Sequence, residues 1–125
     1  MPQLPATPDS VEFEDFPEIH SKTIQKLAHK EITQLFPIQQ KCFYPIYSGY
    51  GVVGRDLTGS GKTLAFSLPL IEQLRSERDF GKRQLRAIAL APTRELALQI
   101  TAVINSLKHY EQEFRVITVY GGTPI

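Results

Sequence analysis

The sequence predicts an α/β fold in which helices cover both faces of a parallel sheet. The prediction rests on three features of the chain after residue 50. Short, continuously apolar segments alternate with amphipathic helical patterns in the order strand, helix, strand, helix, strand, an order typical of parallel sheets. The connections are long enough to carry the chain back across the sheet, so that successive strands can run parallel. A glycine-rich turn, Thr58 to Thr63, follows the first strand and precedes a helix.

Residues 1–12 contain three prolines among small and polar residues, a composition that predicts a flexible leader. We expect order to begin at Phe13. Apolar residues then recur along one helical face, which predicts a helix over about 22–32 capped by Ser21.

A second helix is predicted to start at Pro37, because proline suits the first helical turn. Pro45 should bend its last turn, and Gly49 should end it. The helix contains Cys42, the only cysteine of the chain, which we expect to be a small buried apolar residue rather than a nucleophile. We therefore expect no internal disulfide and no zinc site. Together these elements make a helical segment over 13–50.

The remaining residues, 51–125, hold the predicted sheet. Its elements are a short strand at Val52-Val53, an apolar helix over Leu64–Leu74 kinked at Pro69, a polar loop over 75–86, a buried strand over 85–91 ended by Pro92, a helix over 94–109, and a strand over 116–120 ended by Gly121-Gly122. Ligands of such sheets bind beyond the carboxyl ends of the strands. We therefore expect functional residues in the turns at 56–63, 91–94 and 120–124.

The charge is unevenly distributed along the 125 residues, a length that fits one small domain. Residues 1–20 carry five acids and no Lys or Arg, which leaves 14 bases against 8 acids in residues 22–125. A basic body favours a polyanionic partner. The chain has neither a membrane-spanning apolar run nor a secretory signal. We expect an intracellular, soluble protein, with nucleus, nucleolus and cytoplasm left open.

The glycine-rich turn has the composition of a phosphate-binding loop. Glycines let backbone N–H groups converge on an anion at a helix N-terminus. Lys62 can reach the β- and γ-phosphates, and the Thr63 hydroxyl can coordinate Mg²⁺. The predicted binding residues of the loop are Thr58, Gly59, Ser60, Gly61, Lys62 and Thr63. Asp56 departs from the pattern, since the strict motif has a glycine there. The alternative is a glycine-rich connection in which Gly-Lys-Thr occurs by chance.

A phosphate loop does not select a base, but Gln39 offers a way to do so. A glutamine amide can pair bidentately with N6 and N7 of adenine. The alternative interpretation makes Gln39 an exposed residue in the first turn of a helix.

The motifs jointly resemble those of the DEAD-box RNA helicases. The resemblance rests on the order and spacing of Phe13, Phe36-Pro37-Ile38-Gln39, Thr58–Thr63 with Leu64-Ala65-Phe66, Ala91-Pro92-Thr93-Arg94-Glu95-Leu96-Ala97, and Gly121-Gly122. It covers residues 13–125. The run Leu35–Gln39 with Ile46–Gly49 is most similar to the nucleolar Gu-type subgroup.

The resemblance implies a P-loop NTPase with a RecA-like sheet, here ending after the third strand. It implies that ATP and Mg²⁺ are the cofactors, that Gln39 recognises adenine, and that Phe13 stacks on the base. Lys62 and Thr63 would hold the phosphates and the metal and so carry the catalytic role. Single-stranded RNA would be gripped by its backbone at Pro92, Thr93, Arg94, Gly121 and Gly122, without sequence readout.

Two parts of such an enzyme are missing from the sequence. The family's Asp-Glu-Ala-Asp tetrad is absent, since the only adjacent acid pair is Glu14-Asp15. The second RecA-like domain, expected in a full-length parent, is also absent. The chain therefore reads as an N-terminal part of a helicase, and we expect it to bind nucleotide weakly and to show no ATPase activity alone.

Two other functions stay open at this stage. A different P-loop NTPase, such as a kinase or GTPase, would need neither Gln39 nor the Pro92–Ala97 turn. A nonenzymatic truncation product would make the same nucleotide and RNA contacts and act as a binding or regulatory module.

Overall fold

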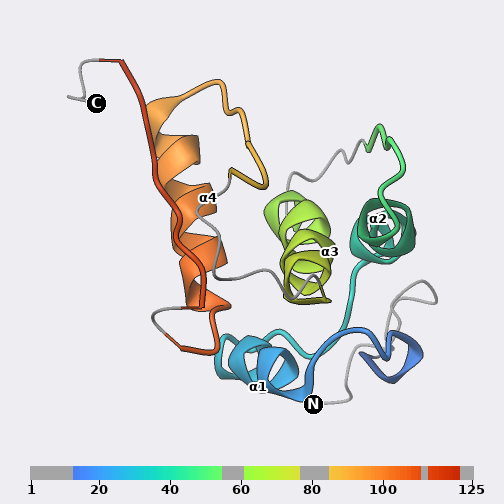
Figure 1. Cartoon of the computed structure of the whole chain (residues 1–125). Coiled ribbons are helices and arrows are strands. Elements are labelled where there is room, and N and C mark those ends of the chain that lie inside the picture. The colour runs from blue at the N-terminus through green and yellow to red at the C-terminus, as the bar shows by residue number, and fades with distance from the viewer. Residues whose placement is uncertain (1–12, 55–60, 77–84, 111–112, 122–125) are drawn as a thin grey trace, which may run out of the picture.

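The computed structural model describes residues 13–54, 61–76, 85–110 and 113–121, and Figure 1 shows how these parts are arranged. The leader 1–12 and most of the polar loop predicted over 75–86 lie outside the described residues. The elements in chain order are a short 3₁₀ helix, η1 (Phe13–Asp15), and the helices α1 (Ser21–His29), α2 (Pro37–Tyr47), α3 (Lys62–Ser76) and α4 (Arg94–Ser106).

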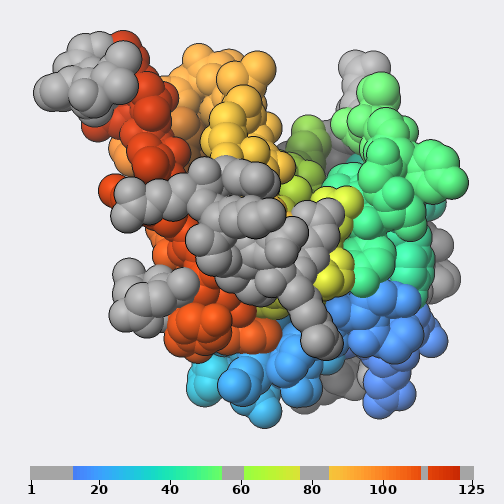
Figure 2. Space-filling model, viewed as in Figure 1, coloured from blue at the N-terminus to red at the C-terminus, as the bar shows by residue number. Residues whose placement is uncertain are grey.

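Helix α3 lies at the centre, between α2 and α4 (Figure 1). Its buried side chains include Leu64, Leu68 and Ile71, and Pro69 is buried inside the helix. A helix that is apolar around most of its circumference must be covered on several sides. In the space-filling view α2 covers one flank and α4 with residues 113–121 the other (Figure 2).

The predicted helices are confirmed, with differences of a few residues at their ends. Helix α1 starts at Ser21, and the residue that caps it is His20, whose Nδ1 accepts a hydrogen bond from the Lys22 N–H at 3.1 Å. Helix α2 starts at Pro37 and contains Pro45, and Gly49 beyond its end has a φ of 86°. The positive φ is the left-handed conformation that glycine adopts most readily.

Helix α4 begins at the predicted residue and ends earlier than predicted, at Ser106 rather than His109. The Thr93 hydroxyl caps it by accepting from the Leu96 N–H at 3.1 Å. Of its apolar side chains and those just after its end, Ile100 and Leu107 are buried, and Leu96 is only partly covered.

The predicted sheet is not confirmed, because no strand occurs in the described part of the chain. The segment 85–91, predicted to be a buried strand, is irregular, and the side chains of Leu85, Ile88 and Leu90 are 80%, 72% and 92% exposed. The segments 52–53 and 116–120 also lack a strand ladder. A parallel strand needs a bonded neighbour and two covering layers, and the described residues supply neither for these segments.

The apolar core joins η1 and α1 to the inner faces of α2 and α3. Phe16 packs edge-to-face on Phe43 with ring centroids 5.2 Å apart, and stacks on Tyr44 at 5.4 Å. The Tyr44 hydroxyl donates to Glu18 at 2.7 Å. Burial, together with the hydrogen bond and charge of Glu18, raises the pKa of Tyr44 to about 12. The aromatic contacts therefore hold the segment before α1 against α2.

A buried polar cluster joins the C-terminal ends of α3 and α4 to α1. Arg75 donates to Glu72 at 2.7 Å, to both carboxylate oxygens of Glu113 at 3.1 and 2.9 Å, and to the Leu107 carbonyl at 2.6 Å. It also donates to the Thr23 hydroxyl at 2.7 Å. Removing one partner of such a buried ion pair costs about 3–5 kcal/mol, because the other charge is left uncompensated.

Thr23 determines which nitrogen of His109 carries the hydrogen. The hydroxyl donates to Glu72 at 2.8 Å and accepts from Arg75. A hydroxyl has one hydrogen and two lone pairs, so His109 Nε2, 3.0 Å away, must be the donor to it. In the neutral ring, the other nitrogen, Nδ1, then carries no hydrogen and lies 3.6 Å from a carboxylate oxygen of Glu113.

This arrangement predicts a loss of stability in mild acid. Burial and the nearby Arg75 guanidinium lower the pKa of His109 from 6.5 to about 4, although Glu113 opposes the shift. The unfolded chain therefore binds the proton first as the pH falls. We expect the free energy of unfolding, measured by urea titration, to decrease by up to about 2 kcal/mol between about pH 7.5 and about pH 5.

The matched variants are His109→Gln and His29→Gln. His109→Gln keeps a donor for Thr23 and has no proton to gain, so its unfolding free energy should be nearly constant over this range. His29 is exposed at the end of α1, and His29→Gln should leave the wild-type slope in place. Equal slopes for wild type and His109→Gln would contradict the prediction.

Candidate functional site

The predicted phosphate-binding residues that the structure describes lie at the start of α3. Gly61 precedes the helix, and Lys62 and Thr63 are its first two residues. The first helical hydrogen bond runs from the Ala65 N–H to the Gly61 carbonyl at 2.9 Å. The N–H groups before Ala65 have no partner within the helix, and together with the helix dipole they favour an anion. Thr58, Gly59, Ser60 and Asp56 lie outside the described residues.

The structure brings Gln39 into contact with this turn. The side chain is buried, with 3% of the residue exposed. Its Oε1 accepts from the Phe36 N–H at 2.9 Å, and its Nε2 donates to the Gly61 carbonyl at 3.3 Å. Gln39 therefore does not lie exposed in the first turn of α2, as the alternative interpretation expected. It connects the start of α2 to the start of α3.

The two aromatic residues near this contact differ in exposure. Phe13, which the family resemblance assigns to base stacking, is 7% exposed and belongs to the apolar core. Phe36 is 51% exposed, and its ring lies next to Gly61. No role was predicted for Phe36 from the sequence, because motif spacing does not show which aromatic ring stays exposed to solvent.

Two hollows border the start of α3. The larger, about 530 Å³, lies between α3 and α4 and is lined in part by Gly61, Lys62, Thr63 and Lys30. Partial desolvation lowers the pKa of Lys30 although the residue is exposed, and its ammonium group hydrogen-bonds to the Ser106 hydroxyl. No motif in the sequence pointed to Lys30. The volume lies in the range of small-ligand sites.

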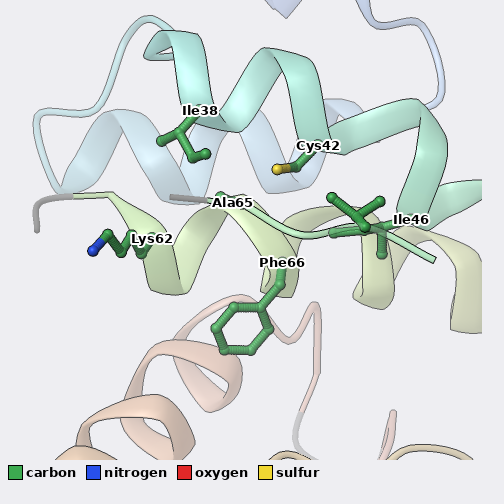
Figure 3. Close-up of a pocket in the computed structure, with 8 residues that line it drawn as sticks. Ile38, Cys42, Ile46, Lys62, Ala65 and Phe66 are labelled. Carbon is green, nitrogen blue, oxygen red and sulfur yellow. The ribbon is translucent and has the colours of Figure 1, made fainter. Parts of the chain in front are cut away.

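The smaller hollow, about 230 Å³, lies between α2 and α3 and also borders Lys62. Figure 3 shows the Cys42 side chain extending from α2 toward α3, with Ile38 and Ile46 on either side of it. Burial raises the pKa of the Cys42 thiol. Cys42 is therefore a buried apolar residue, as the sequence predicted, and not a thiolate nucleophile.

A second cluster of predicted residues meets at the start of α4. Pro92, Thr93 and Arg94 are exposed, and the guanidinium of Arg94 donates to the Gly121 carbonyl at 3.2 Å. The carbon of that guanidinium lies 4.5 Å from the ring centroid of Tyr120. The two motifs assigned to RNA, separated by more than twenty residues, are thus in contact. Gly122 lies outside the described residues.

The described residues contain neither a metal-binding cluster nor a membrane-spanning helix. No set of three or more His, Cys, Asp and Glu side chains there is arranged to hold a metal ion. None of the helices described has both the length and the apolar character needed to cross a bilayer.

The structure thus places the Gln39 amide against the turn that precedes α3, and the Arg94 guanidinium against Gly121 at the start of α4. The family model of the DEAD/DEAH box helicases matches residues 36–125. The chain belongs to the DEAD/DEAH box helicase family, which confirms the resemblance found in the sequence. The RecA-like P-loop fold follows from this membership at the level of the family.

Several curated relatives are similar over nearly the whole chain. Nucleolar RNA helicase 2-B of Xenopus laevis is 45% identical over 115 residues, which are 90% of this chain and 14% of the relative. Human ATP-dependent RNA helicase DDX50 is 41% identical over 113 residues, 89% of this chain and 15% of the relative. DEAD-box ATP-dependent RNA helicase 9 of rice (Oryza sativa subsp. japonica) is 42% identical over 109 residues, 86% of this chain and 17% of the relative. The chain thus spans about one sixth or less of the length of these relatives.

The contact between Gln39 and Gly61 can be tested by adding a methyl group. Gly61 has a φ of 83°, and a Cβ there would lie 2.7 Å from Gln39 Nε2 and 3.3 Å from a ring carbon of Phe36. We expect Gly61→Ala to lower the free energy of unfolding by about 1–2 kcal/mol for the left-handed conformation. A further cost of about 1–3 kcal/mol should come from the displaced amide.

Gly49→Ala separates the two costs. Gly49 has a φ of 86°, and a Cβ there would meet no described atom within 4 Å. Only the conformational cost should appear in this variant. In the Gln39→Ala background, Gly61→Ala should cost less than it does in the wild type, because the displaced amide is no longer present. If Gly61→Ala and Gly49→Ala cost the same in urea titrations, the contact with Gln39 is not a tight one.

Proposed function

We propose that this chain is the N-terminal, nucleotide-binding part of an ATP-dependent RNA helicase. It binds ATP with Mg²⁺ and the backbone of single-stranded RNA, and in the whole protein these events drive RNA duplex unwinding or remodelling. The observation that carries the proposal is the position of the Gln39 amide against Gly61, at the start of the helix that carries Lys62 and Thr63.

The arrangement supports separate recognition of the phosphates and of the base. The turn at 58–63 and the N–H groups at the start of α3 suit the phosphates, Lys62 supplies a positive charge, and the Thr63 hydroxyl is the ligand that would hold Mg²⁺. Bound magnesium would neutralise charge on the phosphate oxygens. Gln39 would meet the adenine edge, and stacking would come from Phe13 or from the exposed ring of Phe36.

The Gln39 amide has enough hydrogen-bond donors and acceptors to bind the adenine edge. Its Oε1 has two lone pairs and its Nε2 two hydrogens. The bonds to Phe36 and Gly61 use one of each, so each atom keeps one for a base. Since Gln39 is buried, a base must uncover the amide, and the 3.3 Å bond to the Gly61 carbonyl is the longer of its two contacts. Base binding would therefore act directly on the turn that holds the phosphates.

RNA binding is supported by the contact of Arg94 with Gly121. Pro92, Thr93 and Gly122 complete the proposed surface. Main-chain groups and an arginine at a helix N-terminus suit phosphates and carry no sequence information. Residues 13–50 form the helical segment that contains Gln39, and 51–125 form part of a RecA-like domain.

In the whole protein we propose that residues 52–53, 85–91 and 116–120 become parallel strands of that domain, beside a second RecA-like domain. The exposed apolar side chains of Leu90, Ile117 and Val119 support this, since strands buried on both faces are apolar throughout. The names of the Xenopus relatives favour a nucleolar location.

Nucleotide calorimetry on the 125-residue chain tests the proposal. ATP with Mg²⁺ should bind more tightly than GTP with Mg²⁺, and Lys62→Ala should weaken ATP binding at least about 10-fold, which is about 1.4 kcal/mol. Gln39→Ala should bring the ratio of ATP to GTP affinity close to one, because a bidentate base contact contributes about 1–3 kcal/mol of discrimination. Gln39→Glu, which keeps the acceptor for Phe36 and loses the donor, should do the same.

Gln40→Ala is the matched control, because Gln40 is the next residue of the same helix and its amide donates to the Leu35 carbonyl. It should leave the preference for ATP unchanged. Equal binding of ATP and GTP by the wild type, or an ATP preference that survives both Gln39 substitutions, would overturn the role of Gln39 and favour another kind of P-loop protein.

A further inference from the structure

Residues 113–121 lie as an extended segment along α4 (Figure 1). Their exposure alternates with a period of two, as it does in a strand with one covered face. The even-numbered residues Phe114, Val116, Thr118 and Tyr120 are half-buried, and the odd-numbered Arg115, Ile117, Val119 and Gly121 are exposed. One side of the segment therefore faces the molecule and the other faces solvent.

Three contacts fix the register of this segment against α4. The ammonium group of Lys108 lies 5.3 Å from the ring centroid of Phe114, and the hydroxyls of Thr101 and Thr118 are hydrogen-bonded. Arg94 reaches Gly121. The partners, Lys108 just after α4 and Thr101 and Arg94 on it, run backward as the segment runs forward, so the segment is antiparallel to the helix. This register brings Tyr120 to the first turn of α4.

Arg94 occupies an electrostatically unfavourable position there. It is the first residue of α4, where the positive end of the helix dipole disfavours a cation and favours an acid such as Glu95. Its guanidinium is held by two contacts, the face of the Tyr120 ring at 4.5 Å and the Gly121 carbonyl at 3.2 Å. An exposed cation–π contact contributes about 0.5–1 kcal/mol.

We propose that Tyr120 is a positioning residue for RNA binding, which acts by holding the Arg94 guanidinium in a fixed plane beside the start of α4. The inference rests on the proposed function, since it assumes that Arg94 binds an RNA phosphate. A guanidinium has five N–H donors in a rigid fork, and one bond to Gly121 does not exhaust them. A pre-positioned fork loses less conformational entropy when it binds a phosphate.

A double-mutant cycle tests this assignment. The measurement is the Kd of the chain, with ATP and Mg²⁺, for a fluorescent single-stranded oligouridylate, by anisotropy at several salt concentrations. Tyr120→Leu should weaken binding about 2- to 5-fold, the cation–π energy expressed as affinity. Tyr120→Phe keeps the aromatic face and should bind as the wild type does. Arg94→Ala should weaken binding and lower the salt dependence by about one phosphate contact.

The decisive measurement is Tyr120→Leu in the Arg94→Ala background. If the ring acts through Arg94, the substitution should have no further effect there. An effect that persists would show that the ring stacks on RNA itself, and a wild-type Kd for Tyr120→Leu would show that the ring has no part in binding. Either result overturns the inference. If Arg94→Ala binds RNA as the wild type does, the proposed RNA surface itself fails.

Val119→Ala is the matched control in the same segment, because its side chain is exposed on the face away from α4. It should leave the Kd unchanged. Thermal unfolding of each variant checks that the segment stays in place. If Tyr120→Leu proves unstable, Arg94→Lys takes its place. A lysine keeps the charge and lacks the planar fork, so Arg94→Lys should weaken binding of the oligouridylate, and an unchanged Kd would contradict the inference.

Discussion

The burial of α3 on nearly all sides is the constraint on which the fold and the candidate site both depend. Its inner residues, among them Leu64, Leu68 and Ile71, are packed between α2 and α4. A fully buried side chain of this size contributes about 1.5–3 kcal/mol. Because α3 cannot rotate without exposing one of these faces, the direction in which its first turn presents Gly61 and Lys62 is fixed by the core.

The two ends of α3 carry the polar contacts that connect it to the rest of the chain. At its start, Gln39 joins the Gly61 carbonyl to α2. Near its end, Arg75 joins Thr23 of α1, Glu113 and the carbonyl that follows α4. Every partner of a buried charge must be present for such a cluster to be stable. The helical segment 13–50 is therefore bonded to both ends of α3, through Gln39 at its start and through Thr23 near its end.

The sequence predicted what is encoded locally. Pro37 and Gly49 marked the ends of α2, and apolar spacing located α1, α3 and α4, since these signals act within a few residues. Motif order also brought out Gln39, Lys62 and Arg94. Contacts between distant residues were not predictable, because the stacking of Tyr120 on Arg94 depends on the register of 113–121 against α4. Spacing likewise could not show that Phe13 is buried and Phe36 exposed. The predicted strands are not confirmed in the described residues for a related reason, since an extended segment becomes a strand only when a bonded neighbour lies beside it.

Both candidate surfaces lie at the N-terminus of a helix, α3 or α4, but their side chains differ. Helices α3 and α4 run in the same direction, with their C-terminal ends joined through Arg75 and Leu107, so both N-termini point to the same end of the molecule (Figure 1). Each N-terminus favours an anion. At α3, Gly61 leaves room for the Gln39 amide, a group that can distinguish bases. At α4 the Arg94 guanidinium is the group that would contact a phosphate. The Tyr120 ring lies against that guanidinium. Under the proposed function, the first surface would therefore select one nucleotide, whereas the second would bind a repeating phosphate backbone of any sequence.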